Sequence, residues 1–126
     1  MKAGDSMIIP DMDFDVMWKD EKVAHICIKD EELVEAVGYT DNNFKRFLPM
    51  CPVTLPLVAH LLEARCWDRN RANIREILDK MRIEDYNPFL IVLQTHGVDY
   101  DDKIWFRFKG EEGMTWNDVD PHRRSA

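Results

Sequence analysis

The spacing of hydrophobic residues changes once along this chain, and this change constrains the fold more than any other feature of the sequence. In residues 13–18, DFDVMW, every second residue is apolar, and residues 22–28, KVAHICI, are rich in apolar and β-branched residues. Alternation with a period of two is typical of β-strands. The Lys-Asp-Glu turn between the two segments therefore predicts an antiparallel hairpin.

Residues 33–39, LVEAVGY, are compatible with two structures. Val34 and Val37 have the spacing of a helix, whereas Leu33, Val37 and Tyr39 have the parity of a strand. We favour a third strand, because two strands alone rarely make a stable sheet. Residues 41–53 hold two prolines and show no period, so we expect a long connection there.

Beyond residue 54 the hydrophobic period becomes helical. Apolar residues three and four positions apart predict a first helix over residues 55–66, which opens near Thr54 with Pro56 in its first turn. The apolar stripe from Ile74 to Met81 predicts a second helix, with charged residues on its other face.

A third helix, over residues 88–96, has the clearest predicted start and end. Asn87 can cap it, Pro88 suits its first position, and Gly97 can adopt the left-handed stop. Three short helices in series could also form a helix-turn-helix with residues 72–82 or 88–96 as its second element. Against this, the third helix is too apolar to lie exposed in a major groove.

The C-terminal part predicts one further strand. An acidic turn over residues 98–103 leads into a strand over residues 104–108, and Thr115 can cap a following turn with Asp118 three residues on. Four aromatic rings supply area to hold this unit to the helices. They belong to Trp105, Phe106, Phe108 and Trp116.

These elements predict an α+β fold with a small N-terminal antiparallel sheet, three short helices and a C-terminal aromatic strand that can join the sheet. The length of 126 residues fits one domain around one core. We expect residues 1–12 and 120–126 to be flexible ends.

Charge is distributed unevenly along the chain, whose formal net charge is −7. Residues 1–35 hold ten acids and four bases, whereas residues 36–96 hold seven acids and eight bases. A protein that binds duplex DNA through phosphates needs a net basic surface, so the acidic third argues against that main function. These acids predict either attraction to a basic partner or merely solvated strands and turns. The candidate partner-binding acids are Asp11, Asp13, Asp15, Asp20, Glu21, Asp30, Glu31 and Glu32.

A second candidate surface is basic and lies where the first two predicted helices meet. Guanidinium groups recognise carboxylates and phosphates well. The same arginines also fit a solvated helix surface with ion pairs four positions apart, such as Arg75 with Asp79. The cluster consists of Arg65, Arg69, Arg71 and Arg75.

Metal and nucleotide sites are not predicted. An acidic loop follows His96, with Asp99, Asp101 and Asp102, but it lacks the ligand spacing, central Gly and final Glu of an EF-type calcium loop. HExxH, Walker, GxGxxG and GxSxG motifs do not occur. We therefore expect no metal, no cofactor and no enzymatic activity.

The three cysteines, Cys27, Cys51 and Cys66, are odd in number and widely spaced, so we expect free and mostly buried thiols in a cytoplasmic protein. Cys66 lies near His60 and Asp68 in the sequence, as a Cys-His nucleophile would. However, no oxyanion-type turn accompanies them, and a buried helix cysteine is the preferred interpretation. The sequence contains no stretch of about twenty apolar residues that could cross a membrane.

A resemblance to one known family is carried by the run RCWDRNRANIREILDKMRIEDYNPFLIVLQTHGVDYDDKIWFRF and, after a turn, MTWNDV. These residues resemble a segment ahead of the kinase domain in HipA-like proteins of Firmicutes, and are similar to small uncharacterised clostridial proteins. The likeness covers residues 60–119. Its matched positions are Arg65, Arg71, Ile77, Leu78, Gly97, Asp102, Trp105, Thr115 and Trp116.

The resemblance implies a companion or regulatory module rather than a phosphotransferase. The ATP-binding and catalytic motifs of such kinases lie downstream of the matched segment, and this sequence ends before them, so no kinase residue is carried over. Most matched positions are structural. We assign structural roles to Gly97, Asp102, Trp105 and Trp116, and we expect Asp102 to bond backbone or an arginine.

We therefore expect a non-enzymatic bacterial or mobile-element module that docks on and regulates a larger protein. Two kinds of partner fit: a kinase-like toxin that it controls as an antitoxin or accessory, and a nucleic-acid-processing complex. A phage-type inhibitor of a defence nuclease, such as an anti-CRISPR protein, would act on the latter. The alternative is a nucleic-acid-binding regulator that uses the arginine-rich helical middle.

Overall fold

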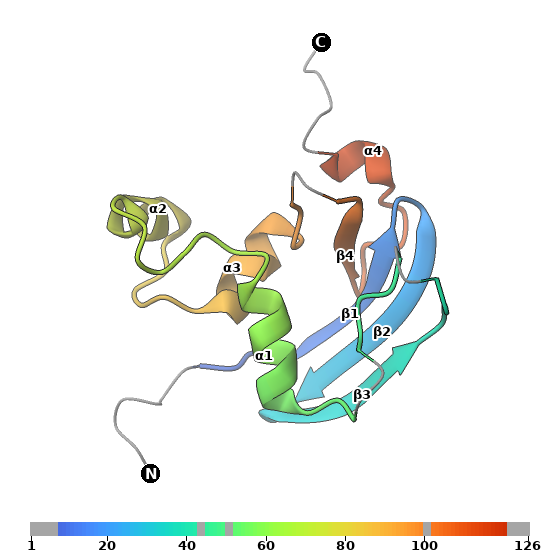
Figure 1. Cartoon of the computed structure of the whole chain (residues 1–126). Helices are drawn as coiled ribbons and strands as arrows, with labels where there is room; N and C mark the ends of the chain where they lie inside the picture. The colour runs from blue at the N-terminus through green and yellow to red at the C-terminus, as the bar shows by residue number, and fades with distance from the viewer. Residues whose placement is uncertain (1–7, 43–44, 50–51, 100–101, 121–126) are drawn as a thin grey trace.

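In a computed structural model of the chain, the described residues are 8–42, 45–49, 52–99 and 102–120. They form one four-stranded antiparallel sheet with helices on one of its faces (Figure 1). This arrangement confirms the predicted α+β class.

The strands are β1 (Met12–Trp18), β2 (Glu21–Lys29), β3 (Glu32–Gly38) and β4 (Ile104–Phe108), in the spatial order β3-β2-β1-β4. The predicted hairpin and third strand are thus confirmed. β4 arrives from the far end of the chain and pairs with β1, so the aromatic strand does join the N-terminal sheet.

The residues of β1 show how the period of two creates two different sheet faces. Phe14 and Val16 are buried, whereas Asp13 and Asp15, which alternate with them, lie on the opposite face. The register pairs Asp15 with His25, so polar residues continue across the neighbouring strand on that same face. Alternation along one strand therefore gives the whole sheet an apolar and a polar side.

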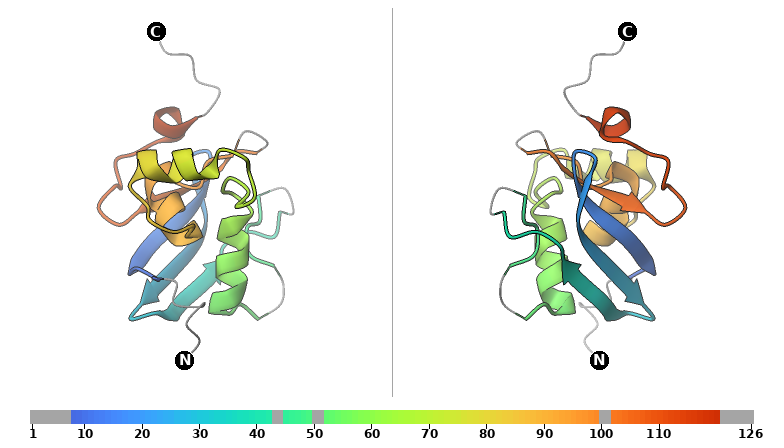
Figure 2. Two further views of the ribbon diagram at one scale, coloured as in Figure 1. Left: turned by 90° about the vertical axis from the view of Figure 1, so that its left-hand side faces the viewer. Right: turned by 90° about the vertical axis from the view of Figure 1, so that its right-hand side faces the viewer.

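The helices are α1 (Leu55–Glu63), α2 (Ile74–Met81), α3 (Pro88–Thr95) and α4 (Trp116–Val119). α1 and α3 lie over the apolar face of the sheet (Figure 2), and α2 stands further from it (Figure 1). The expectation of three helices was short by one, because the turn capped by Thr115 closes into α4. Within the described ranges, no helix is long and apolar enough to cross a membrane.

Two helix ends differ from the predicted ones. α1 stops three residues early, because the N–H groups of Arg65 and Cys66 donate to carbonyls only three positions back, which tightens the last turn. At the end of α3 the left-handed conformation begins at His96, with φ of 58°, and continues into Gly97, with φ of 64°.

The main core lies between the sheet and helices α1 and α3, and it includes Phe14, Phe89 and Phe106. Phe47, from the long connection, packs edge-on against Phe106 with 5.3 Å between ring centroids. The connection predicted over residues 41–53 therefore contributes to the core although its described residues form no helix or strand. A second, smaller cluster joins α2 to α3 around Leu78, Ile83 and Ile91.

Gly97 generates a test of this packing. A Cβ placed there would overlap the buried ring of Phe106, and the backbone is left-handed. We expect Gly97→Ala to lower the free energy of unfolding by about 3 kcal/mol, through backbone strain and overpacking together.

Gly110→Ala is the matched control, since Gly110 is also left-handed, with φ of 95°, but open space lies where the added methyl group would be. It should cost about 1 kcal/mol from backbone strain alone. Urea denaturation measures both variants, and equal losses would contradict the close approach of Phe106 to Gly97.

Candidate partner-binding surface

Arg65 is a structural residue and leaves the set of candidate contact arginines, because its side chain is only 8% exposed. The Arg65 side chain extends from just beyond the end of α1 and forms a bidentate ion pair with Asp102. Nη2 lies 2.6 Å from Oδ1, and Nη1 lies 3.0 Å from Oδ2. Its remaining N–H groups donate to the carbonyls of Gly97 and Ile104. One guanidinium thus ties α1 to both ends of the α3–β4 turn.

Asp102 behaves as expected from the sequence, since it bonds an arginine and backbone. Besides Arg65, its Oδ1 accepts the N–H of Ile104 at 3.1 Å, where β4 begins. Partial burial raises the pKa of Asp102, but the hydrogen bonds and charge of Arg65 outweigh that effect and hold it below the usual value. The charged carboxylate is therefore part of the folded structure.

The other three arginines of the cluster are exposed, and each already has a partner. Arg69 pairs with Glu63 at 3.3 Å and lies over the ring of Tyr86. Arg71 Nε donates to Asn73 Oδ1 at 2.7 Å. These contacts come from the chain's own loop and helix ends, so the arginine cluster does not present four free guanidinium groups.

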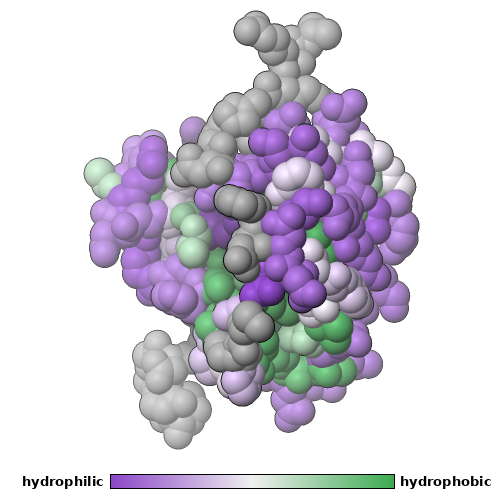
Figure 3. All heavy atoms as spheres, turned by 45° about the vertical axis from the view of Figure 1, so that its right-hand side comes forward, coloured by the Kyte–Doolittle hydropathy of each residue, from purple (hydrophilic) through white to green (hydrophobic). Residues whose placement is uncertain are grey.

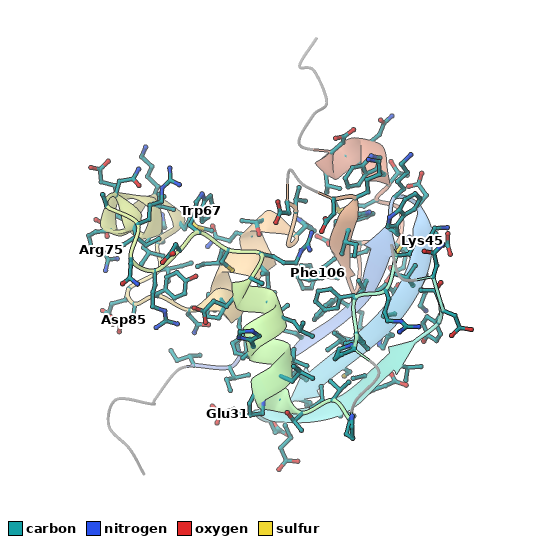
Figure 4. All side chains as sticks on the ribbon, in the orientation of Figure 1. Glu31, Lys45, Trp67, Arg75, Asp85 and Phe106 are labelled. Carbon is teal, nitrogen blue, oxygen red and sulfur yellow. The ribbon has the colours of Figure 1, made fainter. Side chains whose placement is uncertain are left out.

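Arg75 forms the predicted ion pair with Asp79, at 2.9 Å and four positions along α2. It also donates to the carbonyls of Ile83 and Glu84. Figure 4 shows Arg75 and Asp85 on the α2 side of the molecule, far from Lys45 beside the sheet. The arginine cluster and the sheet are therefore separate surfaces.

The acids of the N-terminal third divide into three groups in the structure. The first group surrounds the β2–β3 turn, where the N–H of Asp30 donates to Asp11 Oδ1 at 3.0 Å. Glu31 follows in the same turn and Glu32 begins β3. Both are exposed, and Glu31 is labelled at this end of the sheet in Figure 4. The structure thus brings Asp11 together with acids about twenty residues away.

The second group lies at the opposite end of β2 and is engaged internally. Asp20 Oδ1 accepts the N–H of Trp116 at 2.8 Å, which attaches α4 to the β1–β2 turn. Glu21 pairs with Lys45 at 2.8 Å. Trp105 is fully buried and donates from Nε1 to the carbonyl of Lys19 in this turn. Asp20 and Glu21 are therefore partners within the fold first.

The third group crosses the polar face of the sheet around His25. Its Nε2 lies 2.9 Å from Asp13 Oδ1, and its Nδ1 lies 2.8 Å from Asp15 Oδ1. Glu35, on β3, is 3.6 Å from the same Nε2. Three strands therefore each contribute side chains to one polar row.

Asp15 is the least exposed member of this row, with 17% of its side chain exposed. Arg107 and Lys22 pair with it at 3.2 Å and 3.3 Å. Burial raises the pKa of Asp15, but hydrogen bonds from His25, Arg107 and Lys22 together hold it below the usual value. Asp15 organises the sheet face, and its neighbours Asp13 and Glu35 are the ones that remain open to a partner.

Glu35, His25 and Arg107 were not among the residues singled out from the sequence. Alternation along β2, β3 and β4 places each of them on the polar face, and the pairing of these strands with one another and with β1 fixes which residues lie opposite one another. We define the acidic sheet surface by its exposed or half-exposed carboxylates, which are Asp11, Asp13, Asp30, Glu31, Glu32 and Glu35.

The cysteines do not favour thiolate chemistry. Burial raises the pKa of the Cys66 thiol to about 12, and Sγ faces the carbonyl of Leu62 at 3.2 Å. Cys66 lies just beyond α1 rather than inside it. The pKa of Cys27 is raised by burial first and then by the charges of Asp13 and Glu35. The prediction for Cys51 falls outside the described residues.

The acidic loop after α3 does not gather around His96. His96 Nε2 instead lies 3.0 Å from Glu111 Oε1, in the turn after β4, while Asp102 pairs with Arg65. Asp101 falls outside the described residues. Among the residues that are described, no three His, Cys, Asp or Glu side chains are placed to share a metal ion.

Comparisons with protein-family models, with curated proteins and with solved structures found no match to this chain.

The pair between Arg65 and Asp102 predicts a pH-dependent loss of stability. Because the folded pKa of Asp102 is lowered, its contribution is fully present above the ordinary aspartate pKa and is lost as pH falls through the lowered value. At pH 7 we expect Asp102→Asn to cost about 2 kcal/mol, less than for a fully buried pair because the carboxylate is 39% exposed.

Urea denaturation of both proteins between pH 7 and about pH 3 measures this difference, which should shrink toward the acid end. Asp79→Asn is the control, because the exposed pair with Arg75 should contribute only about 0.3 kcal/mol. A difference between wild type and Asp102→Asn that stays constant with pH would show that the charge of Asp102 is not involved.

Proposed function

We propose that this chain is a non-enzymatic protein-binding module whose acidic sheet surface docks on a basic patch of a larger partner. The observation that carries the proposal is the polar face of the sheet, which no helix covers over β1, β2 and β3 in the described part of the chain (Figure 2). Six carboxylates lie on or beside that face. A face left open and charged in this way is suited to binding another molecule.

Charge supports a basic partner. Between Lys29 and Lys45 the sequence has five acids and no lysine or arginine, and this stretch includes the β2–β3 turn and β3. A concentrated charge of one sign speeds encounter with a surface of the opposite sign and disfavours partners of the same sign. Nucleic acid is therefore repelled by this surface, whereas a protein surface that binds nucleic acid is attracted to it.

The resemblance to HipA-like proteins supports a bacterial or mobile-element setting in the cytoplasm. Within that setting the proposed partners are a kinase-like toxin, which the module regulates as an antitoxin or accessory, and a nucleic-acid-processing complex. For the second partner the acidic sheet surface would occupy a groove meant for phosphates, as a phage-type inhibitor of a defence nuclease would. A nucleic-acid-processing complex offers the basic surface that the proposal needs, because such proteins neutralise phosphates with lysine and arginine.

Capture of the partner from an extract of native host cells tests this proposal. Binding should weaken as salt rises from about 0.1 M to 0.5 M, because ions screen the attraction. Glu31→Gln with Glu32→Gln removes two exposed charges from the surface and should lower affinity about fivefold. Quantitative mass spectrometry of the captured protein, followed by titration of the purified pair, measures the change.

Glu84→Gln with Asp85→Asn is the matched control, since it removes two exposed charges near α2, on another side of the molecule (Figure 4). It should leave affinity unchanged. The proposal is wrong if both double variants weaken binding equally, or if a captured partner binds with no dependence on salt.

The alternative function, nucleic-acid binding through the arginine cluster, has a separate test. Because Arg65 is buried and Arg69 and Arg71 have partners, we expect no detectable binding to random duplex DNA at low salt. Fluorescence anisotropy with labelled DNA measures this. If DNA binds, and Arg69→Ala with Arg71→Ala abolishes the binding, the chain is a nucleic-acid-binding regulator and the protein-binding proposal is wrong.

A further inference from the structure

The two edges of the sheet are treated differently by the fold. At the β4 edge, backbone groups that face away from β1 are bonded one after another. Ile104 N–H donates to Asp102, and Ile104 C=O accepts from Arg65. Phe106 N–H donates to the carbonyl of His96 at 2.7 Å, and Phe108 N–H donates to Glu111 Oε1 at 3.1 Å. This edge is therefore closed to further strands.

At the other edge, β3 directs backbone groups outward, away from β2. Tyr39 N–H donates to the carbonyl of Val23 at 2.8 Å, so Tyr39 and, by alternation, Val37 face β2. Ala36 and Gly38 then direct their N–H and C=O groups outward. No described residue bonds to those groups, so β3 is an open strand edge.

The start of this open edge is marked by a β-bulge. Cys27 pairs with Glu35 and Ile28 pairs with Leu33, which leaves Val34 as the extra residue on β3. Val34 is 63% exposed, and two more apolar or aromatic side chains follow along the strand, Val37 at 38% and Tyr39 at 52%. Three of the four large hydrophobic residues that are most exposed in the described chain therefore lie on or beside β3.

A groove runs along β3 on the side of the core and has a volume of about 570 Å³. The groove has a mixed lining. Its apolar residues are Leu33 and Ala36 on β3 and Phe47, Leu48 and Val53 from the long connection, and its polar residues include Glu35, Asp41 and Arg46. Figure 3 shows hydrophobic side chains gathered at this end of the sheet, below a mostly hydrophilic surface. An extended chain added to β3 would direct alternate side chains into this groove.

The charged residues around the β3 edge favour some added strands over others. Glu32 and Glu35 lie on β3, and Arg46, the cation on the far groove wall, is turned to the carbonyl of Asp41. A second copy of β3 would bring two acidic strands together, which is unfavourable for directly opposed side chains. An added strand with Lys or Arg facing Glu35 would instead gain a cross-strand pair.

We propose that β3 binds an extended segment of a partner protein as a fifth strand of the sheet. The segment alternates apolar residues, which enter the groove beside Ala36, with basic residues, which face Glu35 on the acidic sheet surface. This inference deepens the proposed function, on which it rests, because it names the mode of docking and the kind of partner segment. Main-chain bonds to Ala36 and Gly38 supply affinity, and the alternation supplies specificity.

The test uses three synthetic capped octapeptides: alternating Lys and Val, alternating Glu and Val, and a scrambled Lys and Val sequence. Titration into isotopically labelled full-length protein, followed by NMR, reports each backbone amide. The Lys-Val peptide should shift the amides of Ala36 and Gly38 and slow their hydrogen exchange. The Glu-Val peptide should leave both amides unchanged, and the scrambled peptide should bind at least tenfold more weakly.

Gly38 provides a matched pair of variants, because it is not left-handed and has open space where a side chain would be. Gly38→Pro removes the outward N–H and should weaken the Lys-Val peptide about tenfold, whereas Gly38→Ala keeps the N–H and should bind like wild type. If Gly38→Pro does not fold, Glu35→Lys takes its place. That variant should reverse the preference to the Glu-Val peptide.

Three results would overturn strand addition: equal binding of the Lys-Val and Glu-Val peptides, equal binding by Gly38→Pro and Gly38→Ala, or no shift at Ala36 and Gly38. If hydrogen exchange at these amides slows as the protein concentration rises, without any peptide, the β3 edge binds a second copy of the chain. If salt-dependent capture of the partner persists while Gly38→Pro has no effect on it, strand addition fails and the protein-binding function stands. If the wild-type protein shows no salt-dependent capture of a partner, both strand addition and the protein-binding function are wrong.

Discussion

The buried guanidinium of Arg65 is the interaction on which the arrangement of the fold most depends. The sheet and α1 are built from segments with strong local patterns, but nothing local fixes how β4 returns from α3 to lie beside β1. Arg65 does so by holding the carbonyls of Gly97 and Ile104 and the carboxylate of Asp102 at once. A lysine offers no comparable fork of donors, so the geometry requires arginine. The close approach of Gly97 to Phe106 lies within this turn, where the N–H of Phe106 also donates to the carbonyl of His96.

The same bonds give the sheet its asymmetry. Asp102 and Arg65 close the first backbone groups of β4, and His96 and Glu111 close the next two, so hydrogen-bonding capacity remains at β3. Strand edges promote aggregation when they are left bare, and proteins normally protect them with charge. Glu32 and Glu35 disfavour pairing of β3 with a second copy of itself, because like charges would then lie opposite one another. In the proposed strand addition the same carboxylates would attract the basic segment.

Much of the fold was predictable from local chemistry, and the site was predictable only in part. DFDVMW alternates because β1 has one buried face, and Thr54 and Asn87 cap α1 and α3 as their positions indicated. The partner of Asp102 was predicted as an arginine or backbone but not as Arg65, because the two residues are 37 positions apart and no local pattern links them. The open edge was hidden for a similar reason. Which strand lies at the border depends on where β4 joins, and its aromatic residues indicate a strand without indicating a neighbour.

The separate cluster around α2 has a consequence for how the molecule moves. Leu78, Ile83 and Ile91 form a small core of their own, and the hydroxyl of Tyr86, which donates to Trp67, fastens the loops around it. Releasing α2 would uncover this cluster and leave the larger core beneath the sheet undisturbed. We expect such an element to open at a lower free energy than the whole domain. The strand edge and the acidic face are built on the larger core, so we expect them to keep their shape when α2 opens.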